Sequence, residues 1–330
     1  MRCLVTGAAG QAGSFLCEHL LELGHEVFAM VRRNTSFVAE KSFLSNCLPN
    51  SNFRIVKGDV TDPYSLERLV YEIHPHWFFN AAAQSHVGES WQYPIATVDA
   101  TAKGVLHCLE VIRKTCPSCK FLQFSSSELF GMVRETPQNE LTPFYPRSPY
   151  GVSKLFGHWM TVNYRESYDL FCCSAILFNM ESPRRGSDFV TQKIAQGVAR
   201  IKHGKDKSPI VLGNLDAKRD WNDCRYSVSQ LPKILKRESP EDYVIGSGQT
   251  FSVLDFVEIA FAYAGIEVSI ASDPKFKRPA EVPLLVADPA KARNDLGYDP
   301  FNQQSFKGIV HEMVEAALVS YDPPKTRGQC

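Results

Sequence analysis

Short apolar runs alternate with segments of helical periodicity along the first half of the chain, and this alternation predicts its architecture. The runs that we expect to form strands are residues 3–5, 26–31, 53–57, 77–79, 121–125 and 170–178. Between them, apolar residues recur every three or four positions, as in Leu16, Leu20 and Leu23, which is the period of a helix with one buried face. Strands that alternate with helices favour an α/β fold, a doubly wound parallel sheet with helices on both faces.

The second half of the chain has a less regular pattern from Asn179 onward, and proline and basic residues interrupt it at Pro183, Arg184 and Arg185. At 330 residues the chain is long enough for two lobes around a cleft. We therefore expect a first domain over residues 1–178 and a smaller C-terminal substrate-binding lobe over residues 179–330. Segments of the second lobe can cross back to the first domain.

The first expected strand leads into a glycine-rich turn that is followed directly by a helical segment. Gly7, Gly10 and Gly13 have the spacing G-x-x-G-x-x-G, and strand, turn and helix occur in the order of a dinucleotide-binding unit. Such glycines let the backbone turn tightly and let a pyrophosphate approach the positive N-terminal end of the helix. The first domain is therefore expected to be Rossmann-like.

The ends of the other expected strands indicate which dinucleotide binds. The strand over residues 26–31 ends at Arg32 and Arg33, where an NAD site usually presents an acidic residue to the ribose 2′-hydroxyl. Arginine suits a 2′-phosphate, so NADP is the expected cofactor; the alternative is a solvated arginine pair after a strand. The loops over residues 59–60 and 81–85 follow two further strands and lie where parallel sheets bind cofactors.

Four side chains in the middle of the chain can form one site for proton and hydride chemistry on a sugar. Ser126 and Glu128 follow the strand over residues 121–125, and on extended backbone side chains two apart share a face. Tyr150 and Lys154 are four apart in a helical segment, which also places them on one face. An ammonium beside a phenol is expected to lower the phenol pKa and to make the tyrosine a general base. The alternative for this pair alone is a helix with a half-buried aromatic and a solvated lysine.

Composition and charge exclude other classes of function. Lys and Arg together number 36, as do Asp and Glu, so no general attraction to nucleic acid or membrane is expected. No apolar stretch reaches the roughly 18 residues of a membrane-spanning helix, and Met1 stands too close to the first strand for a signal peptide. We therefore expect a cytoplasmic enzyme. The ten cysteines offer no set of zinc ligands, and Cys116 and Cys119 are expected in a surface turn, so no metal is expected.

Longer blocks of sequence resemble a known family. Residues 6–13, with Tyr150 and Lys154, resemble the extended short-chain dehydrogenase/reductase superfamily. Within it, four blocks resemble GDP-mannose 4,6-dehydratases: FYPRSPYG at 144–151, ESPRRG at 181–186, GNLDAKRDW at 213–221 and RPAEV at 278–282. The resemblance covers nearly the whole chain.

The resemblance implies a lyase that retains NADP and moves a hydride from C4 of a GDP-linked sugar to C6. Tyr150 would take the proton of the C4 hydroxyl, with Lys154 tuning it and holding the nicotinamide ribose. Glu128 would remove the C5 hydrogen that the 4-ketone acidifies, and water would leave from C6. Ser126, where the family has threonine, would hydrogen-bond the C4 oxygen. The product would be the 4-keto-6-deoxy sugar.

The motifs and the resemblance together give the residues expected to touch the two ligands. The expected cofactor-binding residues are Gly7, Gly10, Gln11, Gly13, Arg32, Arg33, Asp59, Val60, Ala81, Ala83, Ser85, Tyr150, Lys154 and Arg185. The GDP-sugar is expected to be bound by Ser85, Asn179, Lys193, Arg219, Arg278 and Glu281. Cations among these suit the diphosphate, and a carboxylate suits the donors of guanine or ribose.

The chain departs from the family pattern at positions near the expected site. Met180 replaces a histidine near the nicotinamide, Phe130 and Ala96 replace tyrosines, and Tyr226 lies in a stretch where the family sequence differs. These departures leave room for a related substrate such as a GDP-heptose.

Two rival functions and one assembly state also follow from the sequence. A reductase or epimerase of the same superfamily would share the glycines, Tyr150 and Lys154 but would not need Glu128. A catalytically silent NADP-binding sensor would tolerate loss of Tyr150 or Lys154, and both are present. The segment over residues 32–37 resembles a family loop that reaches the cofactor of a neighbouring subunit. The resemblance thus implies a homo-oligomer, a tetramer or a dimer.

Overall fold

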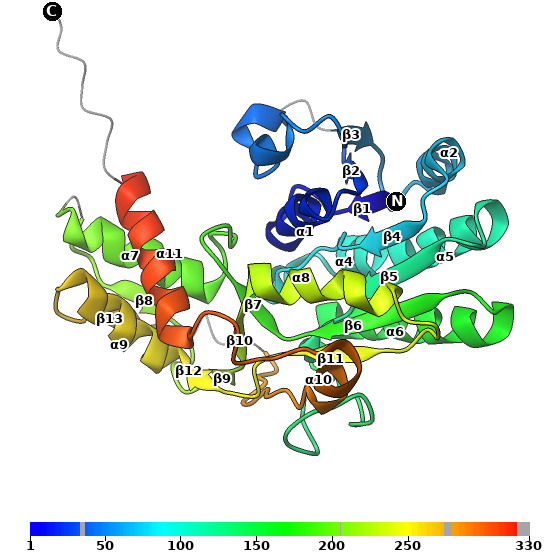
Figure 1. The fold of residues 1–330 in the computed structure, drawn as a ribbon. Helices are drawn as coiled ribbons and strands as arrows, with labels where there is room; N and C mark the ends of the chain where they lie inside the picture. Colours follow the sequence, from blue (N-terminus) through cyan, green and yellow to red (C-terminus); the bar gives the residue numbers. More distant parts are fainter. Residues whose placement is uncertain (34–36, 205, 274–278, 322–330) are drawn as a thin grey trace, which may run out of the picture.

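A sheet of seven parallel strands forms the centre of the fold, with the order β3-β2-β1-β4-β5-β6-β11 (Figure 1). The computed structural model describes residues 1–33, 37–204, 206–273 and 279–321. The strands of this sheet are β1 (Arg2–Thr6), β2 (Glu26–Val31), β3 (Phe53–Lys57), β4 (Trp77–Asn80), β5 (Lys120–Phe124), β6 (Cys172–Leu177) and β11 (Tyr243–Ile245). The chain order reverses beside β1, where doubly wound sheets bind ligands beyond the carboxyl ends of the strands. The expected α/β fold with a Rossmann-like parallel sheet is confirmed.

Helices cover both faces of the sheet because each of them buries one stripe of side chains (Figure 1). Leu16 and Leu231 pack with the strands on one face, whereas Leu69 and Leu109 pack on the other. The helices around the sheet are α1 (Gln11–Glu22), α2 (Pro63–Ile73), α3 (Val87–Gln92), α4 (Pro94–Val98), the π-helical η3 (Asp99–Lys103), α5 (Gly104–Thr115), α6 (Pro149–Tyr168), α8 (Cys224–Leu235) and α10 (Ala290–Leu296).

A second apolar core lies at the far end of the molecule, where α7, α9 and α11 gather in Figure 1. Ile194, Phe256 and Met313 are completely buried in it. Its elements are α7 (Val190–Lys202), β8 (Ile210–Leu212), β12 (Phe251–Ser252), α9 (Val253–Ala264), β13 (Ile270–Ser272) and α11 (Phe306–Tyr321). The short strands β7 (Asn179–Glu181), β9 (Lys218–Arg219) and β10 (Trp221–Asp223) lie between this core and the sheet, β7 paired with β10 and β9 with β12.

The second half of the chain contributes to both cores. β11 pairs in parallel with β6, and α8 packs against α1, so both belong to the central sheet and its helices. Tyr298 is 1% exposed and lies in the apolar core of the sheet. Residues after 178 therefore build the second core and also complete the first.

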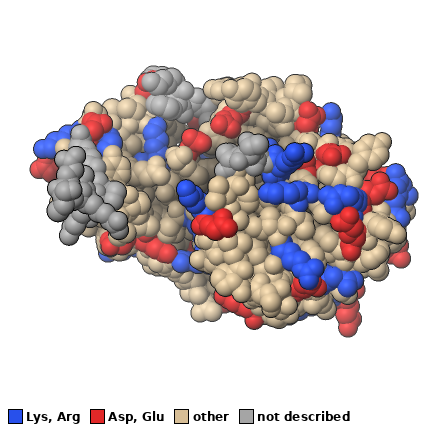
Figure 2. Space-filling view, turned by 90° about the horizontal axis from the view of Figure 1, so that it is seen from above, with Lys and Arg blue, Asp and Glu red and all other residues tan. Residues whose placement is uncertain are grey.

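Charge and cysteines add little to the architecture. Lys and Arg side chains are interspersed with Asp and Glu on the face that Figure 2 shows. Among the described residues, no helix could span a membrane and no group of His, Cys, Asp or Glu could hold a metal ion. The nine described cysteines are free and buried. Cys116 and Cys119 lie in a turn whose middle residues, Pro117 and Ser118, are exposed, as expected for a surface turn, while both thiols pack in the core with Phe121 and Cys172.

Candidate active site

The turn after β1 presents backbone rather than side chains to a large cavity. Gly7 has φ +62°, and a Cβ there would lie 2.6 Å from the carbonyl oxygen of Ala81. A Cβ on Gly13 would overlap the carbonyl oxygen of Gly7. Gly10 is the N-cap of α1. The N–H groups at the start of the helix have no partner within it, so they can bind a ligand at the glycine-rich turn. These features fit the pyrophosphate of a dinucleotide.

A buried chain of polar side chains holds together the carboxyl ends of the three central strands. Thr6 Oγ1 donates to Asn80 Oδ1 at 2.5 Å, and Asn80 Nδ2 donates to Gln123 Oε1 at 2.8 Å. Thr6 Oγ1 also accepts from Ala82 N at 3.2 Å, which fastens the loop after β4 to the end of β1. The chain of bonds fixes the floor of the cavity, since one polar residue from each of β1, β4 and β5 takes part.

Ser126 and Glu128 follow β5, but the backbone between them is not extended as expected. Ser127–Leu129 form a short 3₁₀ helix, η4, and Ser126 is its N-cap: Glu128 N donates to Ser126 Oγ at 3.2 Å. Serine favours this turn because its hydroxyl accepts a hydrogen bond from an N–H two residues later. The side chain of Glu128 nevertheless lines the cavity beside Ser126, where the residue is 8% exposed.

Tyr150 and Lys154 lie one turn apart on the buried face of α6. The helix begins where Ser148 Oγ accepts from Gly151 N at 3.0 Å, with Pro149 as its first residue. Lys154 Nζ donates to the carbonyl oxygen of Phe124 at 2.7 Å and lies 5.8 Å from the centroid of the Tyr150 ring. The ammonium is thus fastened to the end of β5.

Burial dominates the proton affinities of this pair. It raises the pKa of Tyr150 to about 12; a hydrogen bond with Ser126 and the charge of Arg185 act in the opposite direction, while the charge of Glu128 adds to the rise. Burial lowers the pKa of Lys154 to about 8. The expectation that the ammonium lowers the phenol pKa is therefore wrong for this structure, because Lys154 is directed to the Phe124 carbonyl and desolvation disfavours both charges.

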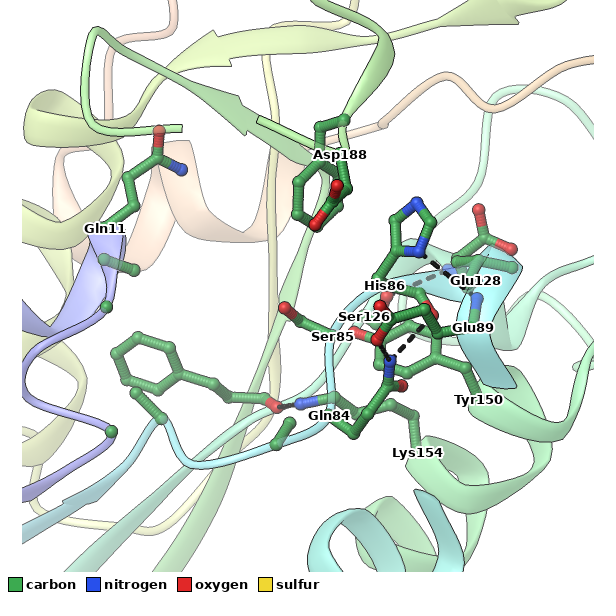
Figure 3. Close-up of a pocket in the computed structure, with 18 of the residues that line it drawn as sticks. Gln11, Gln84, Ser85, His86, Glu89, Ser126, Glu128, Tyr150, Lys154 and Asp188 are labelled. Carbon is green, nitrogen blue, oxygen red and sulfur yellow. Dashed lines mark hydrogen bonds between the residues drawn. The ribbon is translucent and has the colours of Figure 1, made fainter. Parts of the chain in front are cut away.

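One cavity of about 2260 Å³ contains the site (Figure 3). Pockets for one small ligand usually have roughly 300–1000 Å³, so this cavity has room for a dinucleotide and a second ligand. Every expected catalytic, cofactor-binding and substrate-binding residue that the structure describes lines it. Arg278, expected to bind the substrate, lies outside the described residues.

The expected GDP-sugar residues come from separate elements at one end of the cavity. Asn179 begins β7, Lys193 lies in α7 and Arg219 in β9. The neighbouring Asp220 is completely buried and accepts from the backbone N–H groups of residues 247, 248 and 287 at 2.9, 2.8 and 3.0 Å. Burial raises the pKa of Asp220 although these bonds oppose the rise. This carboxyl group thereby ties the chain between β9 and β10 to two loops, one with residues 247 and 248 and one with residue 287.

Two residues expected to touch the cofactor make contacts within the protein. Gln11 Nε2 donates to Met180 O at 2.9 Å, and Gln11 Oε1 accepts from Ser182 Oγ at 2.7 Å, so its amide ties α1 to β7. The guanidinium of Arg185 lies 3.6 Å from the centroid of the Phe189 ring, and its Nε is 3.4 Å from a carboxylate oxygen of Glu181. Both contacts leave the side chains at the cavity wall.

The departures from the family pattern fall in different places. Met180 and Ala96 line the cavity. Phe130 is completely buried, and the centroid of its ring lies 6.0 Å from that of Phe178. Tyr226 Oη donates to the carbonyl oxygen of Asp299. Only the first two changes therefore alter the wall of the site.

Sequence reasoning missed further residues that line the cavity: His86 and Glu89 at the start of α3, Lys103 in η3, and Asp188 and Phe189 before α7. Their signal was available in part, because His86 follows directly on the expected cofactor loop over residues 81–85.

Fold and site together define a class of protein. A doubly wound sheet, a glycine turn at its switch point and a cavity shared by serine, glutamate, tyrosine and lysine are the features of an extended short-chain dehydrogenase/reductase. The family model described as GDP-mannose 4,6 dehydratase matches residues 4–313. The chain belongs to the GDP-mannose 4,6-dehydratase family.

Named proteins agree with this assignment. The chain is 40% identical to a GDP-mannose 4,6-dehydratase of Vibrio cholerae serotype O1, over 96% of this chain and 93% of that protein. It is 42% identical to the GDP-mannose 4,6 dehydratase of Drosophila melanogaster, over 96% and 85%. The solved structure of RMD from Pseudomonas aeruginosa complexed with NADPH has a TM-score of 0.79 at 23% identity, covering 96% of this chain and 99% of that one, and shares the fold.

Proposed function

We propose that the protein dehydrates a GDP-linked sugar, GDP-mannose or a close relative, to the 4-keto-6-deoxy sugar. The observation that carries the proposal is the position of Glu128, which shares the cavity with Ser126, Tyr150 and Lys154. A reductase or an epimerase needs the last three groups, whereas elimination of water also needs a base for the C5 proton. Membership of the family supports the same reading.

NADP is the proposed cofactor, and the residues present fit it. The turn at Gly7, Gly10 and Gly13 would hold the pyrophosphate, as its missing side chains and the N-terminus of α1 allow. Arg32 and Arg33 follow β2 as exposed cations at the cavity wall, where they would bind the 2′-phosphate. When bound, NADP accepts a hydride from C4 of the sugar and returns one to C6.

The protein's own side chains would move the protons. Tyr150 Oη would take the proton of the C4 hydroxyl, and its hydrogen bond with Ser126 places the serine hydroxyl beside the same oxygen. Glu128 would take the proton from C5, which the 4-ketone acidifies; the electron pair of that bond then forms the C5–C6 double bond and water leaves C6. Lys154 would stabilise negative charge near the phenol once its ammonium turns from the Phe124 carbonyl.

The lobe that residues 179–330 mainly form would bind the GDP portion. Lys193 and Arg219 offer cations for the diphosphate, and Asn179 and Glu281 offer polar groups for the sugar and the base. Ser85, on the loop after β4, would complete the sugar site from the first domain. The two ligands would then meet at Tyr150.

We also propose that the protein is a homo-oligomer, a tetramer or a dimer. The outer face of α6 carries Val152, Phe156 and Trp159, which are 55%, 40% and 54% exposed, and Ile95 of nearby α4 is 73% exposed. Apolar side chains gathered on one face are typical of an interface. Light scattering should give a mass of two or four chains, and a monomer at micromolar concentration would contradict the proposal.

A cytoplasmic location is proposed on the state of the thiols. Proteins that fold in oxidising compartments usually pair their cysteines, whereas the nine described cysteines are free. Fractionation of cells that express the protein would test this.

The deciding experiment uses purified protein, GDP-mannose and a trace of NADP. Dehydration predicts a product that is lighter by one water and no net rise in reduced-cofactor absorbance. A product of unchanged mass would indicate an epimerase. Stoichiometric consumption of NADPH, in a parallel reaction supplied with it, would indicate a reductase. Binding of NADP without any turnover would favour the silent sensor.

A further inference from the structure

We propose that His86 is a further catalytic residue, whose Nε2–H donates a hydrogen bond to the C6 oxygen as it leaves the sugar. The inference rests on the proposed dehydration and deepens it. Elimination of water has two ends: Glu128 takes the proton from C5, and negative charge develops on the oxygen as the C6–O bond breaks. Hydroxide is a poor leaving group, so the departing oxygen also needs a hydrogen-bond donor.

His86 stands where such a donor is needed. It follows β4 on the loop that enters α3, and it lines the same cavity as Ser126, Glu128 and Tyr150. In Figure 3 its imidazole lies on the side of the cavity where Glu128 and Tyr150 are drawn. A sugar with C4 at Tyr150 and C5 at Glu128 would turn C6 toward that side.

The hydrogen bond to the backbone decides which ring nitrogen carries the proton. His86 is the N-cap of α3, and its Nδ1 accepts from Glu89 N at 3.2 Å. A backbone N–H can only donate, so Nδ1 has no proton and the neutral ring carries it on Nε2. The imidazole therefore presents a donor at its far end.

The ring is also held in place on its other sides. Its centroid lies 5.3 Å from that of Phe189, edge to face at 85°. A Cβ on Gly88 would come within 2.9 Å of His86 Cε1, so the glycine lets the ring pack against the backbone. Gln84 Nε2 donates to the His86 carbonyl oxygen and to Glu89 Oε2, both at 3.0 Å. Donors held in this way stabilise developing charge without reorganisation.

The atoms of the step balance without an additional acid. Glu128 takes the proton from C5, the electron pair forms the C5–C6 double bond and the C6–O bond breaks. The departing oxygen receives that same proton from the Glu128 carboxyl group and leaves as water. His86 keeps its own proton throughout, and its Nε2–H bond stabilises the negative charge that grows on the oxygen.

Two variants separate the donor at Nε2 from the acceptor at Nδ1. The amide oxygen of His86→Asn can still cap α3 at the place of Nδ1, but this variant has no donor at the place of Nε2. The longer His86→Gln carries an N–H near the place of Nε2 and loses the cap. We expect His86→Asn to lower kcat for GDP-mannose by on the order of 10²-fold with little change in KM, the usual effect of one lost donor. His86→Gln should keep most of the rate and melt at a lower temperature.

Isotope exchange and a second substrate identify the step. In deuterated water, His86→Asn should still put deuterium at C5 of recovered GDP-mannose, because Glu128 and the C4 chemistry are intact. On GDP-6-deoxy-6-fluoromannose, whose fluoride leaves with less assistance, the defect should shrink to within about tenfold.

The outcomes distinguish this inference from the function on which it rests. Failure of the wild type to dehydrate GDP-mannose would overturn both. Wild-type dehydration with an equal rate in His86→Asn would overturn the role of His86 alone. Loss of C5 exchange in His86→Asn, or an equal defect on the fluoro substrate, would do the same, since it would show that the substitution disturbs the whole site.

Discussion

Replacing Lys154 by methionine should change how the stability of the protein depends on pH. Lys154 is 4% exposed, and burial lowers its pKa from 10.5 to about 8. The folded state thus binds this proton less tightly than the unfolded chain, which destabilises the fold below pH 8. At about 1.4 kcal/mol per pKa unit, the penalty is about 3 kcal/mol. It fades as the pH rises from 8 to 10.5, where the unfolded chain also loses the proton.

The variant has no such titration, so the wild type should gain about 3 kcal/mol relative to it across that window. At neutral pH the free energies of unfolding of wild type and Lys154→Met should be nearly equal. Methionine removes the buried charge but leaves the Phe124 carbonyl without its donor, a loss of about 1–3 kcal/mol. The assay is urea unfolding of the cofactor-free protein at several pH values. Lys207→Met, at an exposed lysine, is the matched control and should show no such difference. If the curves of wild type and Lys154→Met stay parallel from about pH 7 to about pH 10.5, burial does not set this pKa.

Further predictions concern the reaction, the cofactor and the assembly. Glu128→Gln should still oxidise C4, but its rate of dehydration should fall by about 10² to 10⁴-fold, whereas Glu67→Gln on the surface should dehydrate at the wild-type rate. In the wild type, deuterium from C4 of the substrate should appear at C6, and its release to solvent would contradict the hydride shuttle. Arg32→Ala should erode a preference for NADP(H) over NAD(H), and calorimetry showing equal affinity of the wild type for both would disprove the 2′-phosphate site. Arg33→Ala should weaken both assembly and NADP retention, so an unchanged mass in light scattering with full cofactor occupancy would exclude that role. Gly13→Ala should lower cofactor affinity, because the added Cβ meets the carbonyl before α1; titration with NADP would reveal an unaffected site.

Local rules predicted the edge of the sheet where the site lies. Parallel strands that alternate with helices bring their carboxyl ends to one edge, and glycines at a strand end indicate a backbone that approaches a ligand. Residues quoted for the ends of β1, β2, β3, β4 and β5 therefore line one cavity in the structure. The prediction worked because each of these strands is short, apolar and followed by polar residues.

Periodicity located α6 but did not identify the face that it buries. The spacing of Leu155, Trp159 and Val162 in the sequence predicts a buried apolar stripe, yet Trp159 is 54% exposed, whereas Lys154 and His158 are 4% exposed. The helix can bury these polar groups against the sheet because they find partners there: Lys154 Nζ donates to a backbone carbonyl 30 residues away in sequence, and His158 Nδ1 lies 3.5 Å from Ser125 Oγ. Hydrophobic pattern alone carries no information on such a partner.

The same limit explains why sequence reasoning misplaced the backbone after Ser126 and missed His86. A strand pattern that ends at Ser125 does not say whether the next residues stay extended, and the hydroxyl of Ser126 decides the matter by capping a 3₁₀ turn at Glu128. His86 follows the expected cofactor loop, but neither its residue type nor its spacing shows that its Nδ1 accepts from Glu89 N beside the catalytic cavity. In each case a polar side chain forms a hydrogen bond to the backbone. Such a bond depends on the three-dimensional geometry, which cannot be read from residue types and their spacing.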